Sequence, residues 1–183
     1  MEKIESDFSH EQIAPYNPKW IDLYETEATK LKEIFGDKLL GIEHIGSTSI
    51  PGLPAKPIID LMILIDSHKN ASKFIPPLQG LDYPFDSTSH TDQSTERHFF
   101  RKGNPTKFHL SVAYADRGGF WKRQLAFRDY LREHPDQRDR YAELKQKLIK
   151  EDPTGKSGYI GGKTELINEI LDKAGFEKRK STE

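Results

Sequence analysis

Hydrophobic residues in the first half of the chain are spaced first as in a helix and then as in strands. Between residues 17 and 36 they recur every three or four positions, the period of an amphipathic α-helix. Asn17-Pro18 is a typical helix start with Asn17 as the cap, and Gly36 is a typical helix end. Two nearly continuous hydrophobic runs, at 39–45 and 58–65, then predict buried strands. The helical positions are Trp20, Leu23, Tyr24, Ala28, Leu31, Ile34 and Phe35.

The second half of the chain predicts a hairpin followed by helices. A short helix is expected at 71–78, and strands at 97–102 and 107–114 are expected to pair around Gly103-Asn104-Pro105. From Gly119 onward the helical period returns in three segments, the last of which is expected to span 159–174. Their marker positions are Trp121, Leu125, Arg128 and Leu131, then Tyr141, Leu144, Lys145 and Leu148, then Leu166, Ile167, Ile170 and Leu171.

These elements predict an α+β fold. We expect residues 1–16 to form an N-terminal arm, residues 17–176 a single domain, and residues 177–183 a charged tail. Residues 82–96 are rich in turn-forming residues and poor in hydrophobic ones. We therefore expect a mobile loop there, which lines or covers the functional site.

The composition narrows the kinds of chemistry and of partner. The chain has 28 Lys and Arg against 29 Asp and Glu, a formal net charge of −1, which gives no general attraction to nucleic acids or membrane surfaces. The absence of cysteine excludes disulfides, thiolate catalysis and cysteine-bound zinc. The N-terminal residues lack the apolar segment of a signal peptide, and no run approaches the ~20 apolar residues of a membrane span. We therefore expect a cytoplasmic protein.

A small-residue turn between the first two predicted strands is the first candidate site. Gly46, Ser47, Thr48 and Ser49 can offer backbone N–H groups and hydroxyls to the phosphate of a ligand. The alternative interpretation is an ordinary helix cap, and Pro51 makes any helix at this place very short.

A single carboxylate, Asp60, interrupts the second hydrophobic run and is the second candidate. A carboxylate in such a run is costly unless it is paired, hydrogen-bonded or bound to a metal. Because side chains alternate along a strand, burying the Ile, Leu and Val faces places Asp60 and His109 on the same side if their strands are neighbours. Asp60 then binds a metal or orients His109 as a proton acceptor. Alternatively, Asp60 is a structural carboxylate that caps a turn or pairs with Arg97 or Arg101.

Basic side chains around the predicted hairpin form a third candidate. Arg97 and Arg101 share a strand face with Phe99 and can hold a phosphate between them. The alternative is a solvated basic face that includes Lys102 and Lys107. Lys163 at the start of the last helix can also face a phosphate. Gly161-Gly162-Lys163-Thr164 lacks the spacing of a P-loop, whose first glycine would fall on Ser157.

The whole pattern resembles the GrpB-like family over roughly residues 14–170. The segment 43–60, EHIGSTSIPGLPAKPIID, is similar to the signature of that family. The similarity continues in YNPKW at 16–20, in RHFFRKG at 97–103 with HLSV at 109–112, and in LAFRDYLR at 125–132. It ends in the segment 159–167.

The resemblance implies a nucleotidyltransferase-like mixed sheet flanked by helices, with a helical C-terminal part. That superfamily holds a nucleoside triphosphate on a Gly-Ser turn, matched here by Gly46 and Ser47. It holds two Mg²⁺ ions on an Asp-x-Asp strand and a third carboxylate, and only the first of these is matched, by Asp60. Met62 stands at the second position, and the strand of His109 carries no carboxylate.

Three functions are consistent with this reduced set. The leading hypothesis is a nucleotidyltransferase-like protein that binds a nucleotide or another phosphorylated small molecule and can transfer a nucleotidyl group, with Mg²⁺ on Asp60 and Glu43 as cofactor. The alternatives are a non-catalytic nucleotide-binding or regulatory module and a metal-dependent hydrolase. The hydrolase would use Asp60 and His109 with a transition metal, which suits an imidazole ligand better than Mg²⁺ does.

Overall fold

The sheet of this protein has four strands in the order β1-β2-β4-β3. The computed structural model describes residues 13–85, 96–117, 119–151 and 161–176. The outer strands β1 and β3 each run antiparallel to their neighbour, whereas the central strands β2 and β4 are parallel. The predicted α+β fold with a mixed sheet is therefore confirmed. The strands are β1 (Gly41–Ile45), β2 (Ile59–Ile65), β3 (Arg97–Lys102) and β4 (Phe108–Tyr114).

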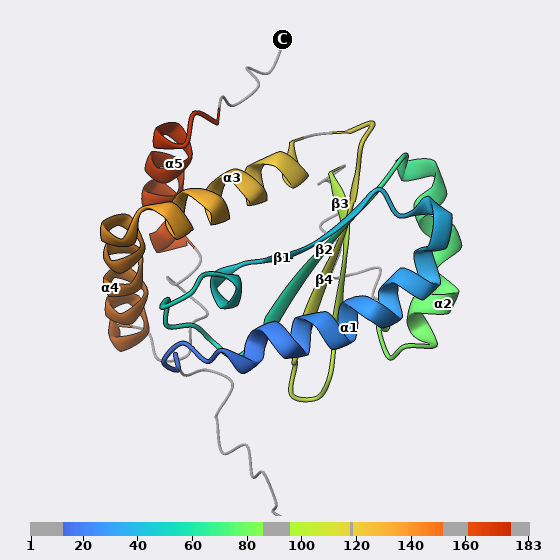
Figure 1. Ribbon diagram of the computed structural model, residues 1–183, viewed down its shortest axis with the longest axis horizontal. Coiled ribbons are helices and arrows are strands. Elements are labelled where there is room, and N and C mark those ends of the chain that lie inside the picture. The colour runs from blue at the N-terminus through green and yellow to red at the C-terminus, as the bar shows by residue number, and fades with distance from the viewer. Residues whose placement is uncertain (1–12, 86–95, 118, 152–160, 177–183) are drawn as a thin grey trace, which may run out of the picture.

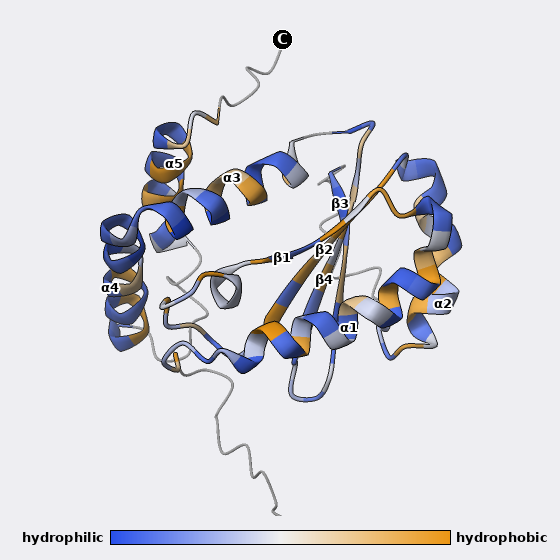
Figure 2. Cartoon of the chain, viewed as in Figure 1, coloured by the Kyte–Doolittle hydropathy of each residue, from blue (hydrophilic) through white to orange (hydrophobic). Residues whose placement is uncertain are grey.

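One face of the sheet is covered by the helices α1 (Lys19–Phe35) and α2 (Ile75–Gln79) (Figure 1). The Asn17 side-chain oxygen accepts a hydrogen bond from the Lys19 N–H at 3.0 Å and so caps α1, and Gly36 ends it. The inward residues of β2 and β4 and the buried stripe of α1 form the main core, because alternation places them on one face. In Figure 2 the helices alternate between hydrophobic and hydrophilic residues, as amphipathic helices do.

On the opposite face, α3 (Phe120–Glu133) packs against the sheet, and α4 (Pro135–Glu151) and α5 (Thr164–Lys173) pack beside α3 to complete the helical C-terminal part (Figure 1). Phe120 of α3 packs against Ile45 and Met62 of the sheet. A second cluster joins the three helices to the segment that follows β1, so that these helices also position the turn between β1 and β2. It contains Ile50, Leu53, Leu131, Tyr141, Leu166 and Ile170.

The observed elements differ from the predicted ones mainly at their ends. The predicted helix at 71–78 is a 3₁₀ segment, His68–Phe74, followed by the single α-turn of α2, where Pro76 and Pro77 occupy the first positions. Leu23, one of the predicted helical positions, is 48% exposed and lies outside the buried stripe of α1. The last helix begins at Thr164, after a 3₁₀ turn at Gly161–Lys163.

Several predicted segments lie outside the described residues. These are residues 1–12 of the arm, 86–95 of the loop, the tail from 177, and the first two residues of the 159–174 helix. The end of the predicted arm is described, and Ala14 pairs there with Ala55 in an isolated antiparallel bridge. Within the described ranges, the helices are too short or too polar to pass through a lipid bilayer.

The free edge of β1 is covered by side-chain donors. The Tyr24 hydroxyl donates to the carbonyl of Ile42 at 3.3 Å, and the Arg128 Nη1 group donates to the carbonyl of His44 at 2.9 Å. Arg128 belongs to α3, so this contact also ties the helical part to the sheet.

Candidate functional site

The turn after β1 is built around Gly46. This residue has φ +70°, a conformation that side chains with a Cβ rarely adopt. A Cβ atom at this position would lie 2.3 Å from Oδ2 of Asp60, so the backbone and that carboxylate are in direct contact. The 3₁₀ segment Ser47–Ser49 follows, and the Ser49 hydroxyl donates to the Gly46 carbonyl at 2.6 Å.

Two of the three turn hydroxyls point into the protein. Thr48 is buried, and its hydroxyl donates to the carbonyl of Ile58 at 3.2 Å and lies 3.0 Å from Nε2 of His44. The Ser49 hydroxyl donates to the Gly46 carbonyl within the turn. The Ser49 carbonyl accepts from Arg132 at 2.7 Å. The turn therefore presents Ser47 to its surroundings, whereas Thr48 and Ser49 fix its shape.

Asp60 and His109 meet as the strand alternation predicted. They are direct partners in the β2–β4 register, and Nδ1 of His109 lies 3.0 Å from Oδ1 of Asp60. The side chain of His109 is 26% exposed and that of Asp60 is 31% exposed, so both can reach a ligand from the sheet face. This geometry confirms that they lie on the same side. Asp60 can hold His109 in one orientation, with the other ring nitrogen directed elsewhere.

Lys145, whose spacing marked only a position of the second predicted C-terminal helix, is the central cation of the site. Lys145 of α4 is only 2% exposed, and its Nζ donates to the hydroxyl of Ser47 at 3.0 Å and to the carbonyl of Pro54 at 2.6 Å. Its third contact is the ring of Tyr141, 5.1 Å away. All its partners in the described part of the chain are neutral. Burial, together with the charge of Lys163, lowers the pKa of Lys145 to about 7.

Lys163 adds a second cation to the same region. It directly precedes α5, as the sequence predicted. Burial, together with the charge of Lys56, lowers the pKa of Lys163 to about 8, against the opposing effect of Asp60. Lys163 is thus within electrostatic range of both Lys145 and Asp60.

The predicted basic cluster of the hairpin is divided between the two faces of the sheet. Arg97 donates to the Ser111 hydroxyl at 2.6 Å, and burial lowers the pKa of Arg97 although Asp60 raises it. Arg101 is exposed beside Phe99, with its guanidinium carbon 5.4 Å from the ring centroid. Lys102 points to the other face, because alternate residues of a strand do, and it pairs there with Glu27 at 2.6 Å.

The donor set around Asp60 does not fit a two-Mg²⁺ centre. Glu43, the predicted second carboxylate, is opposite Met62 in the register and forms an ion pair with Arg128 at 2.7 Å. Ser111 is the β4 partner of Met62, so no further carboxylate faces Asp60 across these strands. Across the described ranges, no three His, Asp or Glu side chains come together as a metal site would require.

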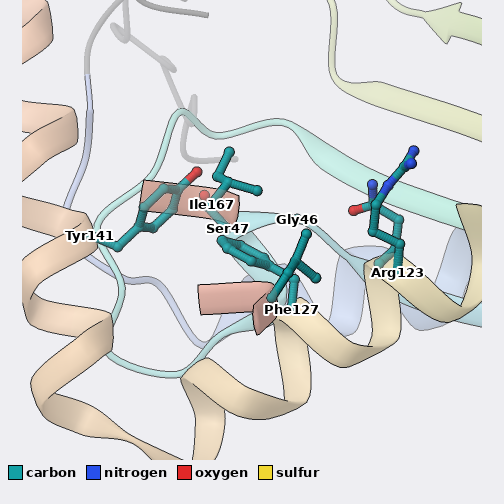
Figure 3. Close-up of a pocket in the computed structure, with 8 residues that line it drawn as sticks. Gly46, Ser47, Arg123, Phe127, Tyr141 and Ile167 are labelled. Atoms are coloured by element: carbon teal, nitrogen blue, oxygen red, sulfur yellow. The ribbon is translucent and has the colours of Figure 1, made fainter. Parts of the chain in front are cut away.

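A pocket of about 160 Å³ opens beside the turn (Figure 3). Its lining residues come from four parts of the chain, the turn after β1 and the three helices of the C-terminal part. They are Gly46 and Ser47 of the turn, Arg123 and Phe127 of α3, Tyr141 of α4 and Ile167 of α5.

The buried His44 below the turn makes stability depend on pH. Burial lowers the pKa of His44 from 6.5 to about 4. The unfolded chain therefore takes up this proton at a higher pH than the folded protein does. The contribution of neutral His44 to the free energy of unfolding is complete above pH 6.5 and is lost as the pH falls toward 4. We expect the free energy of unfolding to fall by up to ~3 kcal/mol over this window. Urea unfolding of the wild type and of His44→Gln at several pH values measures this, because all other titrating groups are common to both. Parallel pH profiles for the two proteins would contradict it.

Comparisons with known proteins agree with the resemblance in the sequence. The model of the family described as GrpB protein matches residues 11–173. The chain is 37% identical over 171 residues to UPF0157 protein PA4798 of Pseudomonas aeruginosa, covering 89% of this chain and 67% of that protein. It is 36% identical over 163 residues to UPF0157 protein YqkA of Bacillus subtilis, covering 89% of this chain and 47% of that protein. The chain thus spans about two thirds and about half of these relatives.

A solved structure supports the same relationship. The crystal structure of conserved protein GrpB from Enterococcus faecalis aligns with a TM-score of 0.80 and 32% identity, over 89% of this chain and 96% of that chain.

Proposed function

The chain belongs to the GrpB family, and from that premise and the geometry around Ser47 we propose that it binds the phosphate group of a nucleotide or of another phosphorylated small molecule. Ser47 and Lys145 would hold the phosphate, and Lys163 would add positive charge. The resemblance to the nucleotidyltransferase superfamily supports a nucleotide as the ligand.

The buried ammonium group of Lys145 is the observation that carries this proposal. Burying a cation without an anion costs several kcal/mol, and its hydroxyl, carbonyl and ring partners do not balance the charge. A phosphate oxygen beside Ser47 would supply the missing charge and accept hydrogen bonds from both side chains. A structural lysine is instead usually paired with a carboxylate.

The Asp60–His109 pair supports a second candidate function, hydrolysis or transfer of the bound group. With Asp60 hydrogen-bonded to one ring nitrogen, the other nitrogen of His109 can take a proton from water or from an acceptor hydroxyl. This step uses the imidazole and the carboxylate alone, because the donor set around Asp60 does not fit Mg²⁺. Release of phosphate or pyrophosphate from a nucleotide that is abolished in both His109→Gln and Asp60→Asn would support this candidate. A non-catalytic module would show binding and no release.

Ser47→Ala tests the binding site. We expect this change to weaken ATP binding about 10-fold, the usual effect of losing one hydrogen bond to a charged group. Calorimetry with ATP, GTP and CTP, with and without Mg²⁺ or Mn²⁺, measures it. Ser67→Ala is the matched control, because the Ser67 hydroxyl is bound to Asp116 away from the turn. If Ser47→Ala and Asp60→Ala both leave nucleotide affinity and turnover unchanged, the site is wrongly assigned.

A further inference from the structure

We propose that the pocket beside Ser47 is a subsite for the planar base of a nucleotide, held by Phe127 and Gln124 of α3. This inference rests on the proposed function, because the phosphate of the same molecule would lie on Ser47 and Lys145. Ser47 belongs to both places: it lines the pocket, and its hydroxyl accepts from Lys145. One ligand can therefore span the two.

The size of the pocket limits what it can hold. Its volume of about 160 Å³ is well below the roughly 300–1,000 Å³ of sites that enclose a whole drug-sized molecule. A pocket of this size accepts one ring system. The charged part of the ligand then stays outside it, on the cations beside the turn.

The walls of the pocket favour a flat, apolar surface. Phe127 and Ile167 contribute hydrophobic side chains (Figure 3), and Leu171 adds a third. The Phe127 ring is held edge-on by Tyr141, with 5.4 Å between their centroids, and is itself only half-buried. A half-buried, positioned aromatic ring next to an anion site is the arrangement on which nucleic-acid bases stack.

A polar group on the same wall favours a base over an alkyl chain. The amide of Gln124 lines the pocket and, within the described ranges, makes no hydrogen bond to the protein. Its NH₂ group can donate and its carbonyl oxygen can accept, which matches the edge of a heteroaromatic base, whereas an alkyl chain would leave both groups unpaired. Arg123, the other polar lining residue, already pairs with Glu96 at 3.2 Å and is therefore not the primary contact.

The test separates the base from the phosphates. Calorimetry compares ATP with inorganic triphosphate on the wild type and on Phe127→Ala. We expect ATP to bind more tightly than triphosphate, and Phe127→Ala to weaken ATP about tenfold, the usual effect of losing one base-stacking ring. Triphosphate affinity should not change, and its retention also shows that the variant is folded. Tyr130→Ala, which removes another α3 ring that stacks on His134 and does not line the pocket, is the control.

Each other outcome has a defined meaning. Equal affinity of the wild-type protein for ATP and for triphosphate would overturn the base subsite and leave the proposed function standing. An equal loss of affinity for ATP and for triphosphate in Phe127→Ala would have the same meaning. Failure of both ligands to bind the wild type would overturn the proposed function and the subsite with it. Tighter binding of hexyl phosphate than of AMP would show an alkyl pocket and would also overturn the inference. A changed preference between ATP and GTP in Gln124→Leu would support it.

Discussion

Replacing Gly46 with alanine is expected to lower the free energy of unfolding by about 3 kcal/mol. The added Cβ would lie 2.3 Å from Oδ2 of Asp60, and the residue would keep φ +70°. Overpacking of this kind typically costs ~1–3 kcal/mol, and the unfavourable backbone conformation adds about 1 kcal/mol. Urea unfolding followed by circular dichroism measures the change.

Two comparisons separate the contact from the backbone strain. Gly36→Ala also places a Cβ on a residue with positive φ, +49°, but no atom lies within 4 Å of it, so only the backbone cost of about 1 kcal/mol is expected. In the double variant Gly46→Ala/Asp60→Ala the shortest contact is removed, and part of the lost stability should return. Equal losses in Gly46→Ala and Gly36→Ala would show that the Asp60 carboxylate does not press on the turn.

Replacing Lys145 with methionine is expected to stabilise the protein and to remove phosphate binding. Methionine fills a similar volume without a buried charge. Exchange of buried ion pairs for hydrophobic residues of similar volume is neutral or adds ~1–4 kcal/mol, and we expect a gain within that range. Binding of ATP or triphosphate should weaken by about 100-fold, because a charge-assisted hydrogen bond is lost. Calorimetry and urea unfolding of the same samples measure both effects. A variant that is both less stable and unchanged in affinity would mean that Lys145 is a structural residue.

The pH dependence of this gain follows from the pKa of Lys145. The folded pKa of about 7 lies below the ordinary value of 10.5, so the wild type loses stability as the pH falls from 10.5 to 7. The advantage of Lys145→Met should therefore be larger at pH 7 than at pH 9, by about 2–3 kcal/mol. Lys147→Met is the matched control, because Lys147 lies on the same helix with a side chain that is 71% exposed. It should change neither stability nor binding at either pH.

The strand positions of the site were predictable because strand alternation is a local property. Asp60 and His109 followed from the faces of two hydrophobic strands, and the turn followed from Gly46 and its small neighbours. The assumption that their strands are neighbours was the one non-local step, and the parallel pairing of β2 with β4 supports it. The cap at Asn17 was equally local, because it depends on a contact two residues away.

The helical cations of the site were not predictable in the same way. Arg128 and Lys145 recur at the helical period together with hydrophobic residues, and a charged residue at such positions was the signal that was available. What each one contacts depends on how α3 and α4 lie against the turn, which the spacing along a helix does not specify. For the same reason the ion pair between Glu43 and Arg128 was missed, and Glu43 was assigned to a metal instead.

The covered edge of β1 has a consequence for how the pocket opens. Arg128 directly follows Phe127 on α3. Its hydrogen bond to the His44 carbonyl therefore ties the helix that lines the pocket to the edge strand β1. Moving α3 outward to enlarge the pocket would break the hydrogen bond from Arg128 to the His44 carbonyl. It would also separate Arg128 from Glu43. These two contacts oppose an outward movement of α3, so the position of the Phe127 wall of the pocket depends on residues that lie outside it.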